Sequence, residues 1–206
     1  MNQIEALQRL RTLATPAVES RDVAALLQVS ASNATTILRR LAAEEMITHL
    51  SRGRWLVNQE IDRLALPELI SAPDPAYVSL QSALFHHGLV EQIPSILYAV
   101  TPGRPRRFRT PMGTISFHRM PPELFKGFEL SSASDAKIAT PEKALFDLIY
   151  LAPGRSRVFS KLPELTIPRR FQWRRLKEYT ELVKSSGRRA FIADRIREIR
   201  SSSSNS

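Results

Sequence analysis

The chain has 206 residues, of which 43% are hydrophobic, and it carries a formal net charge of +10. This length accommodates two modest domains or one large one, and the hydrophobic content excludes wholesale disorder. The absence of cysteine excludes a disulfide framework, Cys-ligated zinc and a thiol nucleophile. No stretch approaches the roughly 20 apolar residues that a membrane span needs. The N-terminus lacks the pattern of a secretory signal, so we expect a cytoplasmic protein with no membrane partner.

The positive charge is unevenly distributed along the chain. Residues 1–70 contain eight arginines and eight acidic residues, whereas the remainder contains 22 basic and 12 acidic groups. The second part therefore carries the whole excess of positive charge. We expect such a domain either to lie along nucleic acid or to meet an acidic or nucleotide-binding partner. A solvated basic surface that only aids solubility is the alternative.

The first elements predicted are helices. The N-terminal helix is expected to bury Ile4, Leu7 and Leu10. Ser20 is then placed to cap a helix over residues 21–28. After a turn at Val29 and Ser30, Ser30 is placed to cap a second helix over residues 31–44. This order of elements predicts a helix-turn-helix pair.

The helix over residues 31–44 has two different sides. Apolar side chains recur at i, i+3, i+4 and i+7, namely Ala34, Ile37, Leu38 and Leu41. The opposite side carries hydroxyls, an amide and a guanidinium, the groups that read base edges in a major groove. We therefore predict groove contacts by Ser32, Asn33, Thr35, Thr36 and Arg39. The alternatives are a solvated polar face and a protein-docking module.

Two short β-like runs follow, over residues 47–50 and 54–57, around the sequence Ser51-Arg52-Gly53. Glycine permits the tight turn of a wing, and flanking arginines are typical of phosphate contacts. The predicted phosphate contacts are Arg40, Arg52 and Arg54. The position before the first run is commonly a glycine, but here it is Glu45. Either Glu45 adopts the left-handed conformation, at about 1 kcal/mol, or the helix is one residue longer.

Prolines mark the predicted boundary between two domains. A short helix is expected over residues 59–69, and the two prolines within residues 71–76 favour an extended connector. The fold class predicted is α+β, an N-terminal winged helix-turn-helix followed by a mixed α/β domain with a basic helical C-terminus. The predicted ranges are 1–70 for the DNA-binding domain, 71–76 for the linker, 77–199 for the α/β domain and 200–206 for a disordered tail.

The second domain is predicted to begin with a helix over residues 80–89, with Ser79 as its N-cap and Gly88 as its stop. Apolar runs between Pro and Gly turns then predict four strands, over residues 96–101, 114–119, 125–130 and 137–139. Two amphipathic, basic helices are expected at the end, over residues 172–185 and 189–199.

The tetrad Thr140-Pro141-Glu142-Lys143 has the features of a helix N-terminus. Its charged residues, with Asp147, form a candidate functional group, and the structural alternative is a cap with a surface pair of Lys143 and Asp147 at i, i+4. The run at residues 104–109 is predicted to be a basic loop, from Arg104, Arg106, Arg107 and Arg109. It suits an acidic partner, a nucleotide or RNA, or it is a solvated hairpin tip.

Motifs for catalysis are weak in this sequence. No glycine-rich phosphate loop is present, and His86 and His87 are adjacent, so they cannot share a metal as an i, i+4 pair does. Asp135-Ala136-Lys137 resembles half of a metal-dependent nuclease core, with Asp74 as a distant second half. We expect no catalytic residue, no metal and no cofactor.

Four blocks follow the predicted winged helix in a fixed order. They are TyrValSerLeuGlnSerAlaLeuPheHisHisGlyLeu at 77–89, IleProSerIleLeuTyrAlaValThr at 93–101, IleSerPheHisArg at 115–119 and IleAlaThrProGluLysAlaLeuPheAspLeu at 138–148. Together, these blocks resemble the AbiEi family of abortive-infection antitoxins. The resemblance extends to about residue 150 and implies a cytoplasmic phage-defence antitoxin and autorepressor. Its expected partners are operator DNA with repeats, bound by a possible dimer, and a nucleotidyltransferase-like toxin.

The resemblance also implies site residues in the second domain. The candidates for toxin neutralisation are Thr140, Glu142, Lys143 and Asp147, with Arg104, Arg106, Arg107 and Arg109 from the basic run. The first four can instead maintain the fold. Two other classes of protein remain open, a ligand-responsive repressor and an enzyme, either a nuclease or a toxin-modifying transferase.

Overall fold

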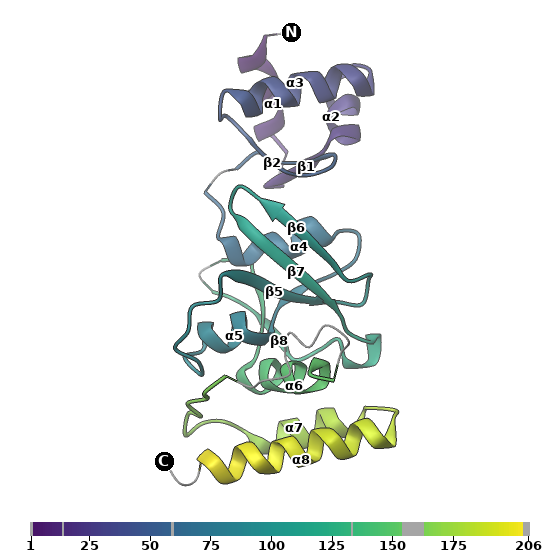
Figure 1. Cartoon of the computed structure of the whole chain (residues 1–206). Coiled ribbons are helices and arrows are strands. Elements are labelled where there is room, and N and C mark those ends of the chain that lie inside the picture. Colours follow the sequence, from purple (N-terminus) through teal and green to yellow (C-terminus); the bar gives the residue numbers. More distant parts are fainter. Residues whose placement is uncertain (1, 14, 59, 133, 154–162, 204–206) are drawn as a thin grey trace.

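The computed structural model describes residues 2–13, 15–58, 60–132, 134–153 and 163–203. Within these ranges the chain has a mixed α/β architecture with eight α-helices and two sheets (Figure 1). A small helical unit with a three-stranded sheet lies at one end, and the C-terminal helices lie at the other. None of the described helices combines the length and the apolar character needed to cross a bilayer.

The N-terminal unit follows the predicted order of elements. Its helices are α1 (Gln3–Arg11), α2 (Ser20–Leu27) and α3 (Ala31–Ala43), and its strands are β1 (Ala17–Glu19), β2 (Thr48–Ser51) and β3 (Arg54–Leu56). The strands form an antiparallel sheet in the order β1-β3-β2. The short strand β1 was not predicted, because three residues are too few to show an alternating pattern.

Capping explains where these helices begin and end. The Ser30 Oγ accepts a hydrogen bond from the Asn33 N–H at 3.2 Å, which confirms the predicted cap of α3. Ser20 instead belongs to α2, and its Oγ accepts from the Trp55 Nε1–H at 2.9 Å, so the predicted cap is wrong. Helix α3 ends at Ala43, and Glu45 has a φ of 57°, the left-handed conformation that glycine adopts more easily.

The core of this unit collects the apolar side of each helix. Leu38 and Leu41 of α3 are fully buried, with Leu10 of α1 and Val23 of α2, beneath the sheet. Ile4, which was expected in this core, is 57% exposed in the first turn of α1, whose buried residues are Ala6 and Leu10. Gly53 turns the hairpin with a φ of 75°, as its sequence predicted.

The second unit is built around a six-stranded sheet in the order β6-β7-β5-β4-β9-β8. Its strands are β4 (Tyr77–Val78), β5 (Ile96–Thr101), β6 (Arg106–Thr110), β7 (Gly113–Arg119), β8 (Phe128–Leu130) and β9 (Lys137–Ala139). The pairs β4–β9 and β5–β7 are parallel and the other neighbours are antiparallel. Strand β8 is shorter than predicted, because the N–H groups of Phe125 and Lys126 bond back to the 3-10 turn η2 (Pro122–Leu124) and Gly127 has a φ of 78°.

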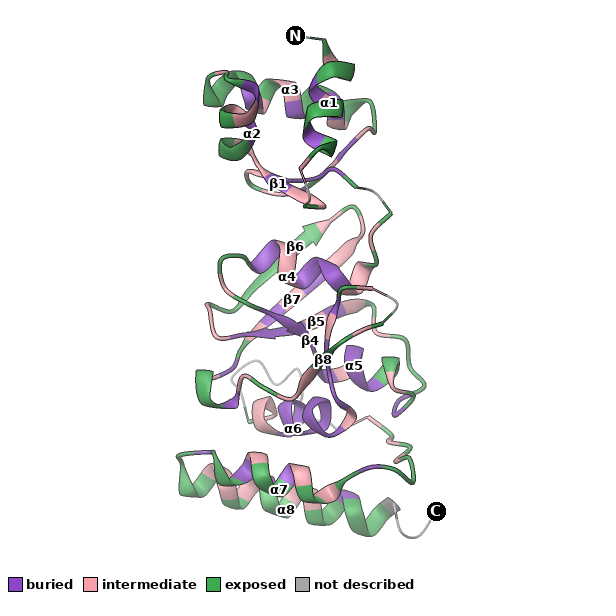
Figure 2. Cartoon of the chain, turned by 180° about the vertical axis from the view of Figure 1, so that it is seen from behind, coloured by how far each residue is buried: buried purple, intermediate pink, exposed green. Residues whose placement is uncertain are grey.

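The helical segments of the second unit pack around this sheet and against one another. They are η1 (Arg63–Ala65), α4 (Leu66–Ser71), α5 (Leu80–His86), α6 (Pro141–Leu151), α7 (Trp173–Glu181) and α8 (Ser186–Ser203). Helix α6 lies between the sheet and the pair α7 and α8, and the colouring of Figure 2 shows it almost entirely buried. The residues of α6 therefore meet neighbours on both sides of the helix.

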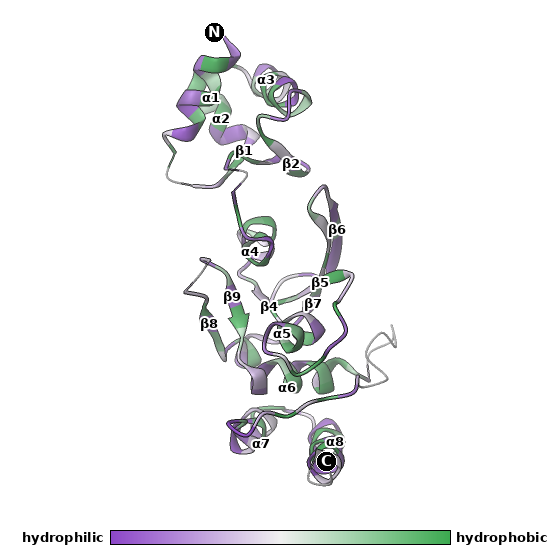
Figure 3. Ribbon diagram, turned by 90° about the vertical axis from the view of Figure 1, so that its left-hand side faces the viewer, coloured by the Kyte–Doolittle hydropathy of each residue, from purple (hydrophilic) through white to green (hydrophobic). Residues whose placement is uncertain are grey.

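The second hydrophobic cluster includes residues well before the prolines. The buried Leu66 and Ile70 of α4 belong to it, and so do Leu50 and Leu56 from the sheet of the N-terminal unit, whereas Val57 belongs to the N-terminal cluster. Ser71 and Ala76, in the predicted linker, are fully buried. The segment 71–76 is therefore partly buried, and Figure 3 shows α4 between the N-terminal sheet and the strands of the second unit.

The C-terminus is more helical than predicted. Helix α8 continues through Ser203, and only residues 204–206 of the predicted disordered tail lie outside the described residues. Helix α7 ends at Glu181, four residues before its predicted end at residue 185.

Candidate functional site

The polar side of α3 is open to solvent. The side chains of Ser32, Asn33, Thr36, Arg39 and Arg40 are exposed and Thr35 is half-buried. The Oγ1 of Thr35 donates to the Ala31 carbonyl at 2.9 Å, and that of Thr36 donates to the Ser32 carbonyl at 3.0 Å. With their protons engaged, these hydroxyls present lone pairs, while the arginines present donors. The surface therefore offers both kinds of hydrogen-bonding group.

The turn of the β2–β3 hairpin carries one of the two predicted wing arginines. Arg52 is exposed beside Gly53, where it is accessible to a phosphate. Arg54 lies differently, with only 16% of its side chain exposed. Its guanidinium donates to the carbonyls of Leu69 and Ile70, and it pairs with Glu19 at 3.1 Å. The prediction that Arg54 holds phosphate is therefore corrected, because its donors face the protein.

Arg54 links the two units through the end of α4. The last carbonyls of a helix lack partners within the helix, and its C-terminus is the negative end of the dipole. The guanidinium of Arg54 also donates to the Ala72 carbonyl, and Arg106 Nη2 donates to the Ser71 carbonyl at 3.1 Å. Two arginines, one from each unit, thus satisfy the end of α4.

The basic run at 104–109 is a strand where a loop was predicted. Residues 106–110 form β6, the edge strand, which pairs antiparallel with β7. Arg107 and Arg109 are exposed, whereas Arg106 also lies over the Phe108 ring, 5.5 Å from its centroid. Arg104 lines a cavity of about 430 Å³, together with Arg119 and Asp74.

Lys143 and Asp147 form a buried ion pair. Both side chains have no exposed surface, so the predicted surface pair is wrong. The Asp147 carboxylate also accepts hydrogen bonds from the hydroxyls of Tyr77 at 3.1 Å and Ser79 at 2.7 Å. The sequence predicted Ser79 as the N-cap of α5. Ser79 does occupy that position, but its side chain makes no capping hydrogen bond. These contacts join α6 to β4 and to the start of α5.

Burial dominates the protonation equilibria of this centre. It raises the pKa of Asp147 above its ordinary value, although Lys143 acts in the opposite direction. Burial also lowers the pKa of Lys143, and it raises the pKa of Tyr77 well above 10 with the help of the Asp147 charge. The ion pair and its two hydroxyl donors offset the desolvation of the charges.

The other members of the predicted tetrad are also structural. Thr140 Oγ1 accepts from the Lys143 N–H at 3.3 Å, which confirms the helix cap, and Glu142 accepts from the Gln172 N–H at 2.9 Å. Thr140 and Glu142 are 7% and 5% exposed. Because Thr140, Glu142, Lys143 and Asp147 are all buried, the structure favours fold maintenance over direct contact with a toxin for these four residues.

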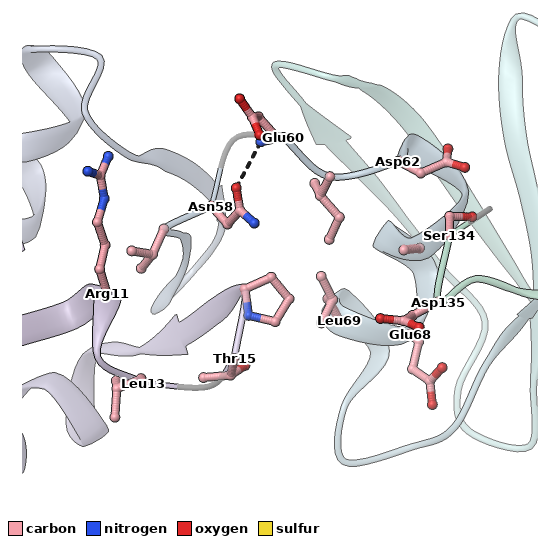
Figure 4. A pocket seen from close by; sticks show the side chains of 14 residues that line it. Arg11, Leu13, Thr15, Asn58, Glu60, Asp62, Glu68, Leu69, Ser134 and Asp135 are labelled. Carbon is pink, nitrogen blue, oxygen red and sulfur yellow. Dashed lines mark hydrogen bonds between the residues drawn. The ribbon is translucent and has the colours of Figure 1, made fainter. Parts of the chain in front are cut away.

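A cavity of about 1030 Å³ lies between the two units (Figure 4). Asn58 and Glu60 line it from the connecting segment, and the Asn58 Oδ1 accepts from the Glu60 N–H at 3.1 Å. Asp135 also lines this cavity, whereas Asp74 lies in the smaller one and Lys137 pairs with Glu68. The residues of the weak nuclease motif are thus directed to different partners. Among the described residues, no cluster of His, Asp and Glu has the arrangement of a metal site.

One group that the sequence did not single out is His118 on β7. Its ring contacts Tyr98 with a centroid distance of 5.9 Å, and its Nε2 lies 3.1 Å from the Ser116 Oγ. Burial lowers the pKa of His118 to about 4 from its ordinary 6.5. The parallel pairing of β5 with β7 brings these residues together, and a sequence pattern does not specify that pairing.

We expect His118 to make the protein sensitive to acid. The unfolded chain takes up a proton near pH 6.5 and the folded chain only near pH 4, so stability falls as the pH is lowered through this window. For a half-buried ring we expect a contribution of about 1–2 kcal/mol. Urea unfolding at pH 7 and pH 4.5 should show a smaller loss of stability in His118→Gln than in the parent. An equal loss would contradict the assignment.

In comparisons with known proteins, no protein-family model matches the chain, and no curated protein matches it either.

Proposed function

We propose that this chain is a DNA-binding autorepressor and antitoxin, whose N-terminal unit is a winged helix. The exposed polar side of α3, next to a hairpin turn that carries Arg52, is the observation that supports DNA binding most strongly. A helix of this kind fits the major groove, and the adjacent turn then meets the backbone. The left-handed Glu45 closes α3 and directs the chain into the hairpin, which agrees with this arrangement.

The proposed groove contacts are Ser32, Asn33, Thr35, Thr36 and Arg39, with Arg40 and Arg52 on phosphates. Arg54 is not among them, because it is bonded to α4. A dimer on repeated operator half-sites would duplicate this surface, and the spacing of the half-sites would follow from the symmetry of the dimer.

The second unit is the proposed antitoxin domain. Its support is the resemblance of residues 77–148 to the AbiEi antitoxins and the exposed guanidinium groups of Arg107 and Arg109. A nucleotidyltransferase-like toxin binds polyanionic substrates, and a basic domain can compete for them or meet an acidic surface. The candidates for these contacts are the arginines of β6 and not the buried tetrad.

The wing can be tested by the salt dependence of DNA binding. Arg52→Ala should lower the slope of log K against log salt by about 0.9, because one phosphate contact is lost. Arg54→Ala, the matched control in the same hairpin, should leave this slope unchanged and lower the unfolding midpoint. Fluorescence anisotropy with labelled duplex measures the slope. An unchanged slope in Arg52→Ala would remove the turn from the DNA interface.

Growth rescue tests the antitoxin part of the proposed function. The gene adjacent to this one is induced in a host cell alone, with the full chain, and with the chain carrying Arg39→Ala. We expect both forms of the chain to relieve toxicity, because neutralisation is assigned to the second unit. A harmless neighbour, or toxicity that neither form relieves, would contradict the antitoxin part of the proposal.

The cavity between the two units favours a second candidate function, a ligand-responsive repressor. Both units line it, through Arg11 and Thr15 on one side and Glu68 and Asp135 on the other. A ligand seated there would change the relation of α3 to the second unit. Release of operator DNA by a small molecule, with no toxin encoded next door, would support this alternative.

A further inference from the structure

One face of the sheet at β5, β6 and β7 combines the β6 arginines proposed above for contacts of the second unit with aromatic and hydroxyl side chains. Residues directly opposite each other on paired strands share a face. The register places Arg107 opposite Ser116, and Ser116 opposite Tyr98. Arg109 lies opposite Thr114 in the same way. These side chains, with His118, therefore form one surface, which we call the β6–β7 face.

On β6 and β7 the opposite side of the sheet belongs to the core, whereas on β5 the core also includes Val100, which lies opposite His118. Ile115 and Phe117 of β7 are buried there in the cluster that contains Leu66 and Ile70 of α4. Figure 2 shows α4 on that side, and Figure 1 shows the other side of β6 and β7 with no helix drawn in front of it. In the part of the chain that the structure describes, the β6–β7 face is thus a side of the sheet that α4 does not cover.

The chemistry of the β6–β7 face is basic, aromatic and hydroxylic. Residues 96–119 contain five arginines and no acidic residue. Arg107 and Arg109 are exposed, and Thr114, Ser116, Tyr98 and His118 are half-buried. Because burial holds the pKa of His118 near 4, its imidazole is uncharged at neutral pH and can stack like Tyr98.

We propose that the β6–β7 face binds unpaired nucleic acid strands, with bases stacked on Tyr98 and His118 and phosphates held by Arg107 and Arg109. A sheet face with partly exposed rings and neighbouring guanidinium groups suits splayed bases, whose faces a duplex conceals. Ser116 and Thr114 supply hydroxyls for the sugar and the base edges. This activity is separate from the duplex binding proposed for α3.

The test is fluorescence anisotropy of the full chain with short labelled RNA, with single-stranded DNA of the same sequence, and with the corresponding duplex. At about 50 mM salt we expect single strands to bind in the micromolar range. Arg107→Gln with Arg109→Gln should weaken this binding about tenfold and reduce the salt slope by about 1.4, since two phosphate contacts are lost. A preference for RNA over DNA would narrow the ligand to RNA, and equal affinity would assign unpaired strands in general.

Two control variants and one further variant of the site separate this site from other basic surfaces. Arg174→Gln with Lys177→Gln removes the same charge from exposed positions of α7 and should leave the affinity within about twofold. Tyr98→Leu keeps apolar bulk but removes the ring, and should weaken single-strand binding about tenfold. Arg39→Ala should leave single-strand binding unchanged, so failure of this proposal is distinguishable from failure of the operator proposal.

Three results with the wild-type chain, the β6 variant and the α7 control would overturn the proposal. They are no single-strand binding below about 100 μM, equal losses in the α7 control and the β6 variant, and a duplex that binds as tightly as the single strands and depends on the same residues. Binding that tolerates Tyr98→Leu would also contradict it, because charge alone would then account for the affinity.

Discussion

Replacing Lys143 by Met is expected to lower the free energy of unfolding by about 3–5 kcal/mol, because the Asp147 carboxylate is left buried without its cation. Lys143 and Asp147 have no exposed surface, and only the hydroxyls of Tyr77 and Ser79 would then face the charge. Burial already raises the pKa of Asp147, so the folded variant binds its proton more tightly than the unfolded chain. The stability of the variant should therefore decrease as the pH rises from the ordinary pKa of an aspartate to the raised pKa of the buried Asp147.

A double variant tests whether the loss of stability comes from the unpaired charge. Lys143→Met with Asp147→Asn removes both charges and retains an acceptor for Tyr77 and Ser79, so most of the lost stability should return. Arg174→Met is the matched control, because Arg174 and Glu178 form an i, i+4 pair with side chains 86% and 57% exposed. We expect it to cost under about 0.5 kcal/mol in urea unfolding. A Lys143→Met variant as stable as Arg174→Met would contradict the structural role of the pair.

Arg39→Ala is expected to weaken binding to operator DNA by about 1–3 kcal/mol, with a smaller effect on unrelated duplex. Arg39 is exposed on the same side of α3 as Thr36 and Ser32, and its guanidinium has no acidic partner among the described ion pairs. A guanidinium that reads a base edge loses both affinity and sequence preference when it is removed. Competition binding with operator and unrelated duplex separates the two effects.

Arg40→Ala is the matched control for Arg39→Ala. It removes the same charge one residue further along α3, where we propose a phosphate contact. Its affinity loss should be equal on operator and unrelated duplex, because a phosphate contact carries no sequence information. Equal losses for Arg39→Ala as well would reduce Arg39 to a phosphate contact. If neither variant loses affinity for DNA, this side of α3 does not contact DNA.

Local chemistry made some elements predictable from the sequence. The cap at Thr140 with Pro141 after it, the cap at Ser30, and the turns at Gly53 and Gly88 each depend on residues within one helical turn. The strands β5, β7 and β9 were found for a similar reason, since each is a short apolar run bounded by turn residues. Strand β6 was missed because an edge strand with three arginines lacks that pattern.

Tertiary contacts decided what the sequence did not reveal about the site. Lys143 and Asp147 were predicted to form a surface pair, but α6 lies between the sheet and the helices α7 and α8, so both side chains lie inside the protein. Arg54 was predicted to face DNA because its neighbours give no hint that α4 ends beside it. The juxtaposition of Tyr98 with His118 likewise depends on which strands pair.

Competition between two duplexes tests whether α3 reads a specific DNA sequence. The full chain is titrated into labelled duplex from the region upstream of its own gene, in the presence of excess unrelated duplex at physiological salt. If α3 makes sequence-specific contacts, the upstream duplex should bind at least about 10³-fold more tightly than the unrelated duplex, and Arg39→Ala should reduce this preference. Equal affinity for the two duplexes, or a preference that Arg39→Ala leaves intact, would contradict specific reading by α3.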